Sequence, residues 1–392
     1  MIAKALSALP IIDISPWLSD SDTSHRLSVA ASIHSACLEY GFFYLNISAI
    51  ADPSEPEELR RLAQEFFDLP QEEKDKLSIA HQDHARGYQR LNENVTNGLA
   101  DNHEAIDFYR PVENPDKERP LWGENQWPDW IPGFREKYEA WTAKMKRLGM
   151  AVMEAMAVGL GMTPEEYKEL RDQTDDSFWV MRIIGYPPLP EGANGFSCGA
   201  HKDYGCLTFL WADPTKNALQ VFLPHDKTSV LVNTNDNSDV KESAKQESLE
   251  DGVWISADPI PGCVVCNIGE MWEIWTNGLY KSTLHRVVHR GQNYRVSIPF
   301  FYEPNFTALV SPLPAALRIQ GDMAESGEHG EKIYDRVWPQ KKYEPTVYGD
   351  FLMRKVDANF VPSREQSRAA SREQSRAGSR EGSVVRAEEV KP

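Results

Sequence analysis

The run His201-Lys202-Asp203-Tyr204-Gly205-Cys206-Leu207-Thr208-Phe209-Leu210 decides how the second half of this chain is interpreted. It is rich in aromatic and aliphatic residues and is followed by the turn pair Asp213-Pro214, which predicts a strand over 199–211. Side chains two residues apart lie on the same face of a strand. We therefore expect the imidazole of His201 beside the carboxylate of Asp203. With one further histidine they would form the two-histidine, one-carboxylate set that binds ferrous iron.

The third ligand has two candidates on one predicted strand. A strand is expected over 282–290, and His285 and His289 share one of its faces. At ~3.4 Å per residue these two histidines lie ~13 Å apart, so only one of them can join the first pair.

A carboxylate-binding pair follows further along the chain. Arg295 and Ser297 stand two residues apart in a predicted strand and therefore share a face. The guanidinium can bind a carboxylate through two hydrogen bonds, and the hydroxyl can add a third. The sequence thus predicts a metal site and a carboxylate site in the same half of the chain.

Composition and charge limit the partners. Of the 392 residues, 41% are hydrophobic and 26% charged, a balance typical of a globular protein. The formal net charge of −17 disfavours nucleic acid and anionic membranes as partners. No apolar run reaches the length of a membrane span, and residues 1–10 lack the pattern of a signal peptide. We expect a cytoplasmic protein, with the oligomeric state left open and a monomer favoured.

The five cysteines are scattered and odd in number, which suits a reducing compartment better than a disulfide framework. Cys263 and Cys266 form a C-x-x-C spacing that permits a zinc or redox interpretation. Metal knuckles need a second ligand pair, and none stands nearby. A buried strand over 262–268 is the favoured interpretation.

Two patterns of periodicity divide the chain. Helical spacing predicts helices over 24–40, 55–67 and about 133–160, and a long polar loop is expected over 86–110. After Asp176, short strand-like runs separated by Pro, Gly and Asn turns predict a closed or double-layered antiparallel sheet. The predicted strands span 178–186, 199–211, 218–223, 252–255, 262–268, 282–290 and 294–302.

These patterns predict an α+β fold in four parts. Residues 1–175 form a mostly helical region, and 176–310 form the sheet core, with a polar insertion at 224–251. Residues 311–361 form a C-terminal helical segment. Residues 362–392 are expected to be a disordered Ser- and Arg-rich tail, because this composition buries too little apolar surface to offset the entropy of ordering it.

Four motifs, in this order, carry a resemblance to one enzyme family. They are His201 to Thr208, Asn267-Ile268-Gly269-Glu270, Trp275 to Val287, and Arg295 to Phe301. Together they closely resemble the iron(II)/2-oxoglutarate-dependent dioxygenases, in the isopenicillin N synthase-like branch. The resemblance covers roughly residues 8 to 305. It implies a double-stranded β-helix (jelly-roll) core flanked by helices, in agreement with the predicted sheet.

The resemblance also implies the metal ligands. By matched motif position, His201, Asp203 and His285 are the catalytic residues that bind Fe(II), and His289 is not a ligand. Three such ligands leave one face of the iron open.

The cosubstrate residues follow in the same way. Arg295 and Ser297 match the pair that binds the distal carboxylate of 2-oxoglutarate, and Tyr186 matches a tyrosine that often adds a hydrogen bond to it. Two positions depart from the family pattern: Ile184 stands where plant relatives often carry asparagine, and Glu270 stands where aspartate is frequent. The first departure affects the detail of cosubstrate binding, and neither affects the ligands.

The implied reaction uses Fe(II), 2-oxoglutarate and O2 to oxidise a small organic molecule, with release of succinate and CO2. Hydroxylation, desaturation and ring closure are all compatible with the sequence. The protein places the reacting C–H bond and excludes water. Within the family the alternatives are an iron oxidase that does not use 2-oxoglutarate in this way, and an ethylene-forming enzyme. A zinc hydrolase and a non-catalytic binding protein are alternatives from other classes.

Candidate substrate-pocket residues, by their position in the family, are Tyr88, Phe108, Arg110, Trp272 and Phe301. Packing in the core or in loops is an equally good interpretation of these five.

Overall fold

The computed structural model of the chain describes residues 9–19, 22–189, 196–224, 252–326 and 341–356. It divides into two compact units, Met1–Tyr348 and Gly349–Pro392. The description below concerns the first unit; residues 349–356 of the second are helical. The predicted insertion, apart from its first residue, and the predicted tail at 362–392 lie outside the described residues.

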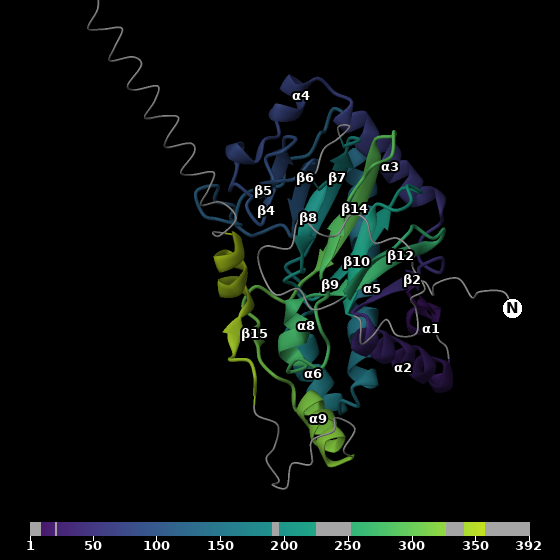
Figure 1. The fold of residues 1–392 in the computed structure, drawn as a ribbon. Helices are drawn as coiled ribbons and strands as arrows, with labels where there is room; N and C mark the ends of the chain where they lie inside the picture. Colours follow the sequence, from purple (N-terminus) through teal and green to yellow (C-terminus); the bar gives the residue numbers. More distant parts are fainter. Residues whose placement is uncertain (1–8, 20–21, 190–195, 225–251, 327–340, 357–392) are drawn as a thin grey trace, which may run out of the picture. The chain divides into compact units, whose positions relative to one another are not determined.

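A large sheet of eight strands forms one layer (Figure 1). Its spatial order is β1-β2-β12-β9-β14-β7-β6-β3, and every neighbouring pair is antiparallel except β1 with β2. In chain order the strands are β1 (Ile11–Asp13), β2 (Phe42–Asn46), β3 (Gly87–Gln89), β6 (Glu104–Tyr109), β7 (Val180–Tyr186), β9 (Leu207–Ala212), β12 (Cys263–Ile268) and β14 (Arg295–Tyr302).

A smaller antiparallel sheet of four strands forms the second layer, in the order β11-β10-β13-β8. Its strands are β8 (Cys198–His201), β10 (Leu219–Pro224), β11 (Gly252–Ser256) and β13 (His285–Val287). Two short pairs complete the strands: β4 (Val95–Thr96) with β5 (Leu99–Ala100), and β15 (Leu309–Val310) with β16 (Thr346–Val347). The two layers and their helices form the α+β jelly-roll fold that the sequence predicted.

Helices cover the outer side of the large sheet. Both α3 (Ser54–Phe67) and α5 (Phe134–Gly159) pack on β14, and α2 (Thr23–Glu39) packs on α5. The approach of α5 is close, since a Cβ at Gly149 would lie 2.3 Å from the Tyr302 ring. The other helical segments are α1 (Ser15–Leu18), α4 (Gln71–Asp75), η1 (Ile79–His81), α6 (Pro164–Asp172), α8 (Glu270–Trp275) and α9 (Pro314–Ser326). Among the described residues, no helix is both long and apolar enough to cross a membrane.

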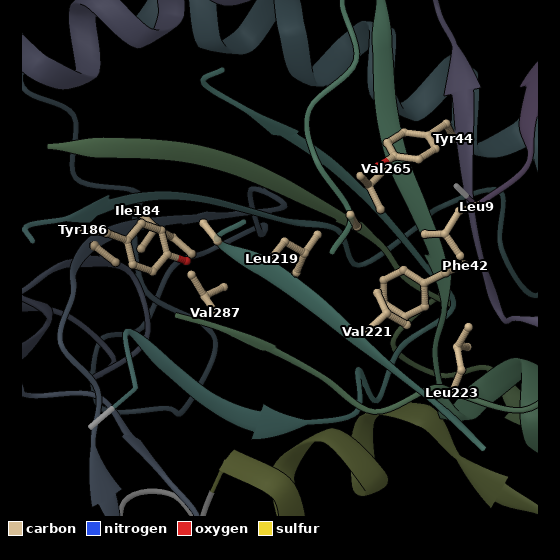
Figure 2. Close-up of a cluster of buried hydrophobic side chains, with 13 residues drawn as sticks. Leu9, Phe42, Tyr44, Ile184, Tyr186, Leu219, Val221, Leu223, Val265 and Val287 are labelled. Carbon is tan, nitrogen blue, oxygen red and sulfur yellow. The ribbon is translucent and has the colours of Figure 1, made fainter. Parts of the chain in front are cut away.

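Apolar side chains fill the space between the two sheets (Figure 2). Alternate residues of β10, namely Leu219, Val221 and Leu223, are buried, as the two-residue period of a strand requires. They meet Val265 from β12 and Val287 from β13. Full burial of each such side chain contributes about 1.5–3 kcal/mol. This cluster fixes the separation of the sheets on which the functional residues lie.

The prediction of one continuous strand over 199–211 is wrong for residues 202–206. The chain ends β8 at His201, crosses to the other layer through residues 202–206, and begins β9 at Leu207. The crossing is held by α8, whose Glu270 and Met271 amides donate to the carbonyls of Asp203 and Gly205 at 2.8 and 3.0 Å. Tyr204 and Cys206 in the crossing are compatible with a strand, so the sequence pattern alone does not reveal the break.

Two further expectations are also wrong. The loop predicted over 86–110 contains β3 and β6, and five of the six residues of β6 are buried. Buried charged residues in β6 hide its strand character, because alternation of polar and apolar residues is lost. The strand predicted over 282–290 is limited to His285–Val287, so His289 lies beyond its end.

Candidate active site

His201, Asp203 and His285 meet where the two layers adjoin. The two histidines are register partners on the antiparallel strands β8 and β13, and Asp203 follows in the crossing segment. The Nε2 atoms of His201 and His285 lie 3.7 and 3.6 Å from Oδ1 of Asp203. One ligand atom from each of the three lies within 4.8 Å of the other two.

Backbone carbonyls orient both imidazoles. Nδ1 of His201 lies 2.8 Å from the Gly199 carbonyl oxygen, and Nδ1 of His285 lies 3.1 Å from that of Thr283. A carbonyl only accepts, so each Nδ1 carries a proton and Nε2 is the ring nitrogen that remains available to a metal. Burial lowers the pKa of His285 to about 4, which favours the neutral form that binds metals.

The carboxylate of Asp203 is oriented by two side chains from the large sheet. Its Oδ2 accepts hydrogen bonds from the Thr208 hydroxyl at 2.5 Å and from the Asn267 amide at 2.7 Å. Oδ1 is left facing the imidazoles. Burial opposes ionisation, but His285, His201 and these hydrogen bonds outweigh it and hold the pKa of Asp203 below its usual range. The sequence analysis assigned no role to Thr208 or Asn267, although both stand in the quoted motifs.

This donor set fits a ferrous ion. Two imidazole nitrogens and one carboxylate oxygen lie within 4.8 Å of one another, a donor set that binds ferrous iron and leaves open positions for other ligands. His289 is not part of the cluster of ligand atoms, and its Nε2 lies 2.6 Å from the Asn293 carbonyl oxygen. Cys263 and Cys266 are free thiols and belong to no metal-ligand cluster among the described residues.

Arg295, Ser297 and Tyr186 form a second group. Arg295 and Tyr186 are register partners on β14 and β7, and the guanidinium carbon lies 4.8 Å from the centre of the Tyr186 ring. Ser297 shares the face of Arg295 and hydrogen-bonds Tyr186. Arg295 is only 1% exposed, yet its Nε and Nη1 have no hydrogen-bond partner among the described residues. A buried cation with free donors is costly, so this position is suited to an anionic group.

A cavity of about 470 Å³ reaches Arg295. Its lining includes Leu210, Leu219 and Val265, all from strands of the two layers. The three residues of the metal-ligand cluster are not among its lining. The cavity therefore reaches Arg295 without being lined by that cluster.

The candidate pocket residues occupy varied environments. Phe108 is buried and stacks on Trp127 with ring centres 3.8 Å apart, and Trp272 is fully buried. Tyr88 is buried and donates to Glu104 at 2.5 Å, while Arg110 pairs with Asp176. Asp107 and Arg182, whose charges face each other on neighbouring strands, were not among the predicted site residues.

Comparisons with known proteins agree with this geometry. The model of the non-haem dioxygenase N-terminal family, described for morphine synthesis, matches residues 9–130, and that of the 2OG-Fe(II) oxygenase superfamily matches residues 224–304. A homoarginine-6-hydroxylase of Glycine max is 38% identical over 92% of this chain and 99% of its own length. One from Oryza sativa subsp. japonica is 38% identical over 90% and 98%.

A solved structure agrees as well. The full-length Neurospora crassa protein in complex with alpha-KG and 5-formyluracil is 25% identical, with a TM-score of 0.67 over 91% of this chain and all of its own. The chain belongs to the 2-oxoglutarate- and Fe(II)-dependent oxygenases. It is an oxidoreductase that uses Fe(II), 2-oxoglutarate and O2 to oxidise a small organic molecule, as the sequence predicted.

Proposed function

We propose that His201, Asp203 and His285 are the Fe(II) ligands, through Nε2, Oδ1 and Nε2. The observation that supports this best is that every other polar atom of these side chains is already engaged, by Gly199, Thr283, Thr208 and Asn267. Only the three converging atoms remain free to bind a metal. An iron ion held there would supply, together with 2-oxoglutarate and O2, the chemistry that oxidises a C–H bond of the substrate.

The distal carboxylate of 2-oxoglutarate binds to Arg295, Ser297 and Tyr186 in this proposal. The unpaired Nε and Nη1 donors of the buried Arg295 support it, since a carboxylate would satisfy both. Ser297 lies on the same strand face and can add a hydrogen bond. Ile184, the register partner of Ser297 on β7, has an apolar side chain and can offer the cosubstrate no side-chain hydrogen bond.

The primary substrate in this proposal is a small basic amino acid, and the reaction is its hydroxylation. Support comes from the two relatives at 38% identity that are named as homoarginine-6-hydroxylases and that match this chain nearly end to end. Residues of both charge signs lie buried on the strands next to the site, which suits a substrate that carries both charges.

A substrate screen tests this function. The purified protein is incubated with Fe(II), 2-oxoglutarate and O2 and with homoarginine, arginine, lysine or thymine, and succinate and hydroxylated product are both quantified. We expect one hydroxylated product per succinate with a basic amino acid. Product without succinate would identify an iron oxidase of another type, and turnover of thymine alone would refute the amino-acid substrate.

The setting of the enzyme is part of the proposal. We place it in the isopenicillin N synthase-like branch and in the cytoplasm, as a monomer that binds neither nucleic acid nor membranes. The −17 net charge and the five free cysteines support this setting. We also propose that residues 176–310 are the catalytic core and that 1–175 flank it, contributing four strands to the large sheet.

A further inference from the structure

Asp107 and Arg182 form a buried pair of opposite charges on the large sheet. They are register partners on β6 and β7, and Nε of Arg182 lies 3.3 Å from Oδ1 of Asp107. Asp107 is 5% exposed, whereas 23% of the Arg182 side chain remains accessible. Arg182 also donates to Gln89 at 2.8 Å and to Asn94 at 2.6 Å. The guanidinium is thus held in place by neutral acceptors as well as by the carboxylate.

Hydrogen bonding in this group is incomplete. Within the described part of the chain, Asp107 Oδ1, Arg182 Nε and Asn94 Nδ2 are buried without a hydrogen-bond partner, although Nε and Oδ1 form the ion pair. Leaving such atoms unpaired costs about 1–3 kcal/mol each. The buried pair of Glu104, on the same strand as Asp107, with Lys74 shows the opposite case. The Glu104 carboxylate accepts hydrogen bonds from Lys74 at 2.7 Å, Tyr88 at 2.5 Å and Tyr294 at 2.8 Å. The Lys74–Glu104 pair is completed by the protein, and the Asp107–Arg182 pair is not.

Two structural links connect the incomplete pair with the metal-ligand cluster. Across the sheet, Thr208 pairs with Phe301, Phe301 with Val180, and Val180 with Tyr109. This row links the residue that holds Asp203 to the strand of Asp107 over three strand spacings, about 14 Å on a flat sheet and less on a curved one.

The segment that supplies Asn94 provides the second link. Three residues later, Asn97 donates to the Ala200 carbonyl at 2.9 Å, directly before His201. Within the same segment, Thr96 hydrogen-bonds Asp101, whose carboxylate accepts from the Gly199 amide at 2.8 Å. The Asp107–Arg182 pair and the metal-ligand cluster are therefore joined through one short stretch of chain.

We propose that Asp107 and Arg182 bind the head group of an α-amino acid substrate, with Arg182 on the α-carboxylate and Asp107 on the α-ammonium. This inference rests on the proposed function. Adjacent charges of opposite sign match the two charges of that head group, and a guanidinium fork matches a carboxylate in shape. The side chain of the substrate then extends toward His201 and His285, which places a carbon remote from the head group at the metal.

Substrate analogues test the assignment on the unaltered enzyme. KM is measured for the amino acid, for its des-amino analogue and for its carboxamide. Loss of one charge-assisted contact to a buried partner predicts KM values raised at least roughly 30-fold for each analogue. Equal KM values for all three compounds would overturn the inference while leaving the hydroxylase function intact. No turnover of any basic amino acid would instead overturn the proposed function.

Variants then assign each charge to its residue. In Asp107→Asn, KM for the amino acid should rise by the same factor, and removal of the α-amino group should cost nothing further. In Arg182→Gln, KM for the amino acid should also rise by that factor, and replacing the carboxylate of the substrate by a carboxamide should raise KM no further. A purely structural pair would leave the KM ratios between analogues as in the wild type.

Glu104→Gln is the matched control, because it breaks a buried ion pair on the opposite face of the same strand. It should lower the melting temperature without changing the KM ratios. If Glu104→Gln changed those ratios as much as Asp107→Asn does, the assignment would be wrong.

Discussion

At the scale of single residues, the site depends on polar atoms whose partners are fixed before any ligand arrives. In each of the three proposed ligand side chains, one polar atom is hydrogen-bonded within the protein and the other is left for a metal. Arg295 is the opposite case, since two of its donors have no partner among the described residues although the side chain is buried. Such an arrangement is costly in the free protein and becomes favourable when an anion binds.

Arg295→Ala should therefore weaken 2-oxoglutarate much more than Fe(II). Removing a charge-assisted contact to a buried carboxylate costs roughly 2–5 kcal/mol. Ser297→Ala removes one neutral hydrogen bond and should cost about 1 kcal/mol. Calorimetric titration of each variant with 2-oxoglutarate measures both effects. Unchanged affinity in Arg295→Ala would place the carboxylate-binding site elsewhere.

At the scale of elements, the crossing between β8 and β9 positions Asp203, and Gly205 lets the chain pass. A Cβ at Gly205 would lie 1.7 Å from Oε2 and 2.0 Å from Cδ of Glu303, a side chain that is itself buried. Moving the Glu303 carboxylate aside would break its 3.0 Å hydrogen bond from the Cys206 amide in the crossing segment. The crossing thus requires glycine for space.

We expect Gly205→Ala to lower Fe(II) affinity by roughly 10- to 100-fold, the usual effect of disturbing groups that support a metal ligand. Gly321→Ala, in α9, is the control, because a Cβ there meets nothing within 4 Å and alanine favours a helix. Metal titration of both variants gives the comparison. Equal iron affinity in the two would show that the crossing tolerates a side chain.

Glu303 makes the same segment sensitive to pH. Burial raises the pKa of Glu303 to about 8, although hydrogen bonds from Tyr348 and from the Cys206 amide oppose the shift. The folded protein therefore holds this proton to higher pH than the unfolded chain, whose glutamates titrate near 4.5. This group's contribution to the free energy of unfolding accordingly falls as pH rises from about 4.5 to about 8.

Glu303→Gln removes that dependence. The melting temperature of the variant, relative to the wild type, should be higher at pH 8 than at pH 5. Thermal unfolding at both values measures it, and an identical offset at the two would mean that Glu303 is ionised throughout.

The elements also show which features the sequence could predict. Helices over 24–40, 55–67 and 133–160 are confirmed to within about one residue at each end, because their apolar faces follow the helical period. The break between β8 and β9 was missed because tertiary contacts from α8 and Glu303 create it, and local composition does not record them. β6 was missed because Glu104 and Asp107 interrupt its apolar pattern, and both are buried through partners distant in sequence. The prediction that His201, Asp203 and His285 lie together is confirmed, whereas the contacts of Thr208 and Asn267 with Asp203 could be found only from the structure.

At the scale of the whole molecule, both layers contribute to one site, since His201 and His285 come from the small sheet and Arg295 from the large one. The site therefore depends on the apolar cluster between the sheets (Figure 2). The C-terminal tail predicted at 362–392 has no part in this account. Five serines there each follow an arginine by three residues, a spacing that basic-directed kinases favour, although a solvated repeat without a role remains the preferred interpretation.

A chain stopped after Phe360 should keep its iron stoichiometry, melting temperature and turnover. Its sequence beyond that point lacks the apolar residues needed to pack on a core. A large drop in melting temperature on truncation would show that the tail stabilises the fold. Mass spectrometry of protein from its native cell tests the kinase spacing, because phosphate on these serines would add about −1.5 to −2 charges each at pH 7.

The central claim is that His201, Asp203 and His285 hold the iron that works with 2-oxoglutarate. Anaerobic titration with Fe(II) and then 2-oxoglutarate, followed by visible absorption, tests it most directly. The account predicts one iron per chain and a weak visible band in the wild type and in His289→Ala. Each of His201→Ala, Asp203→Ala and His285→Ala should lose both iron and turnover. Loss of iron in His289→Ala to the same extent, or full retention in Asp203→Ala, would contradict the assignment.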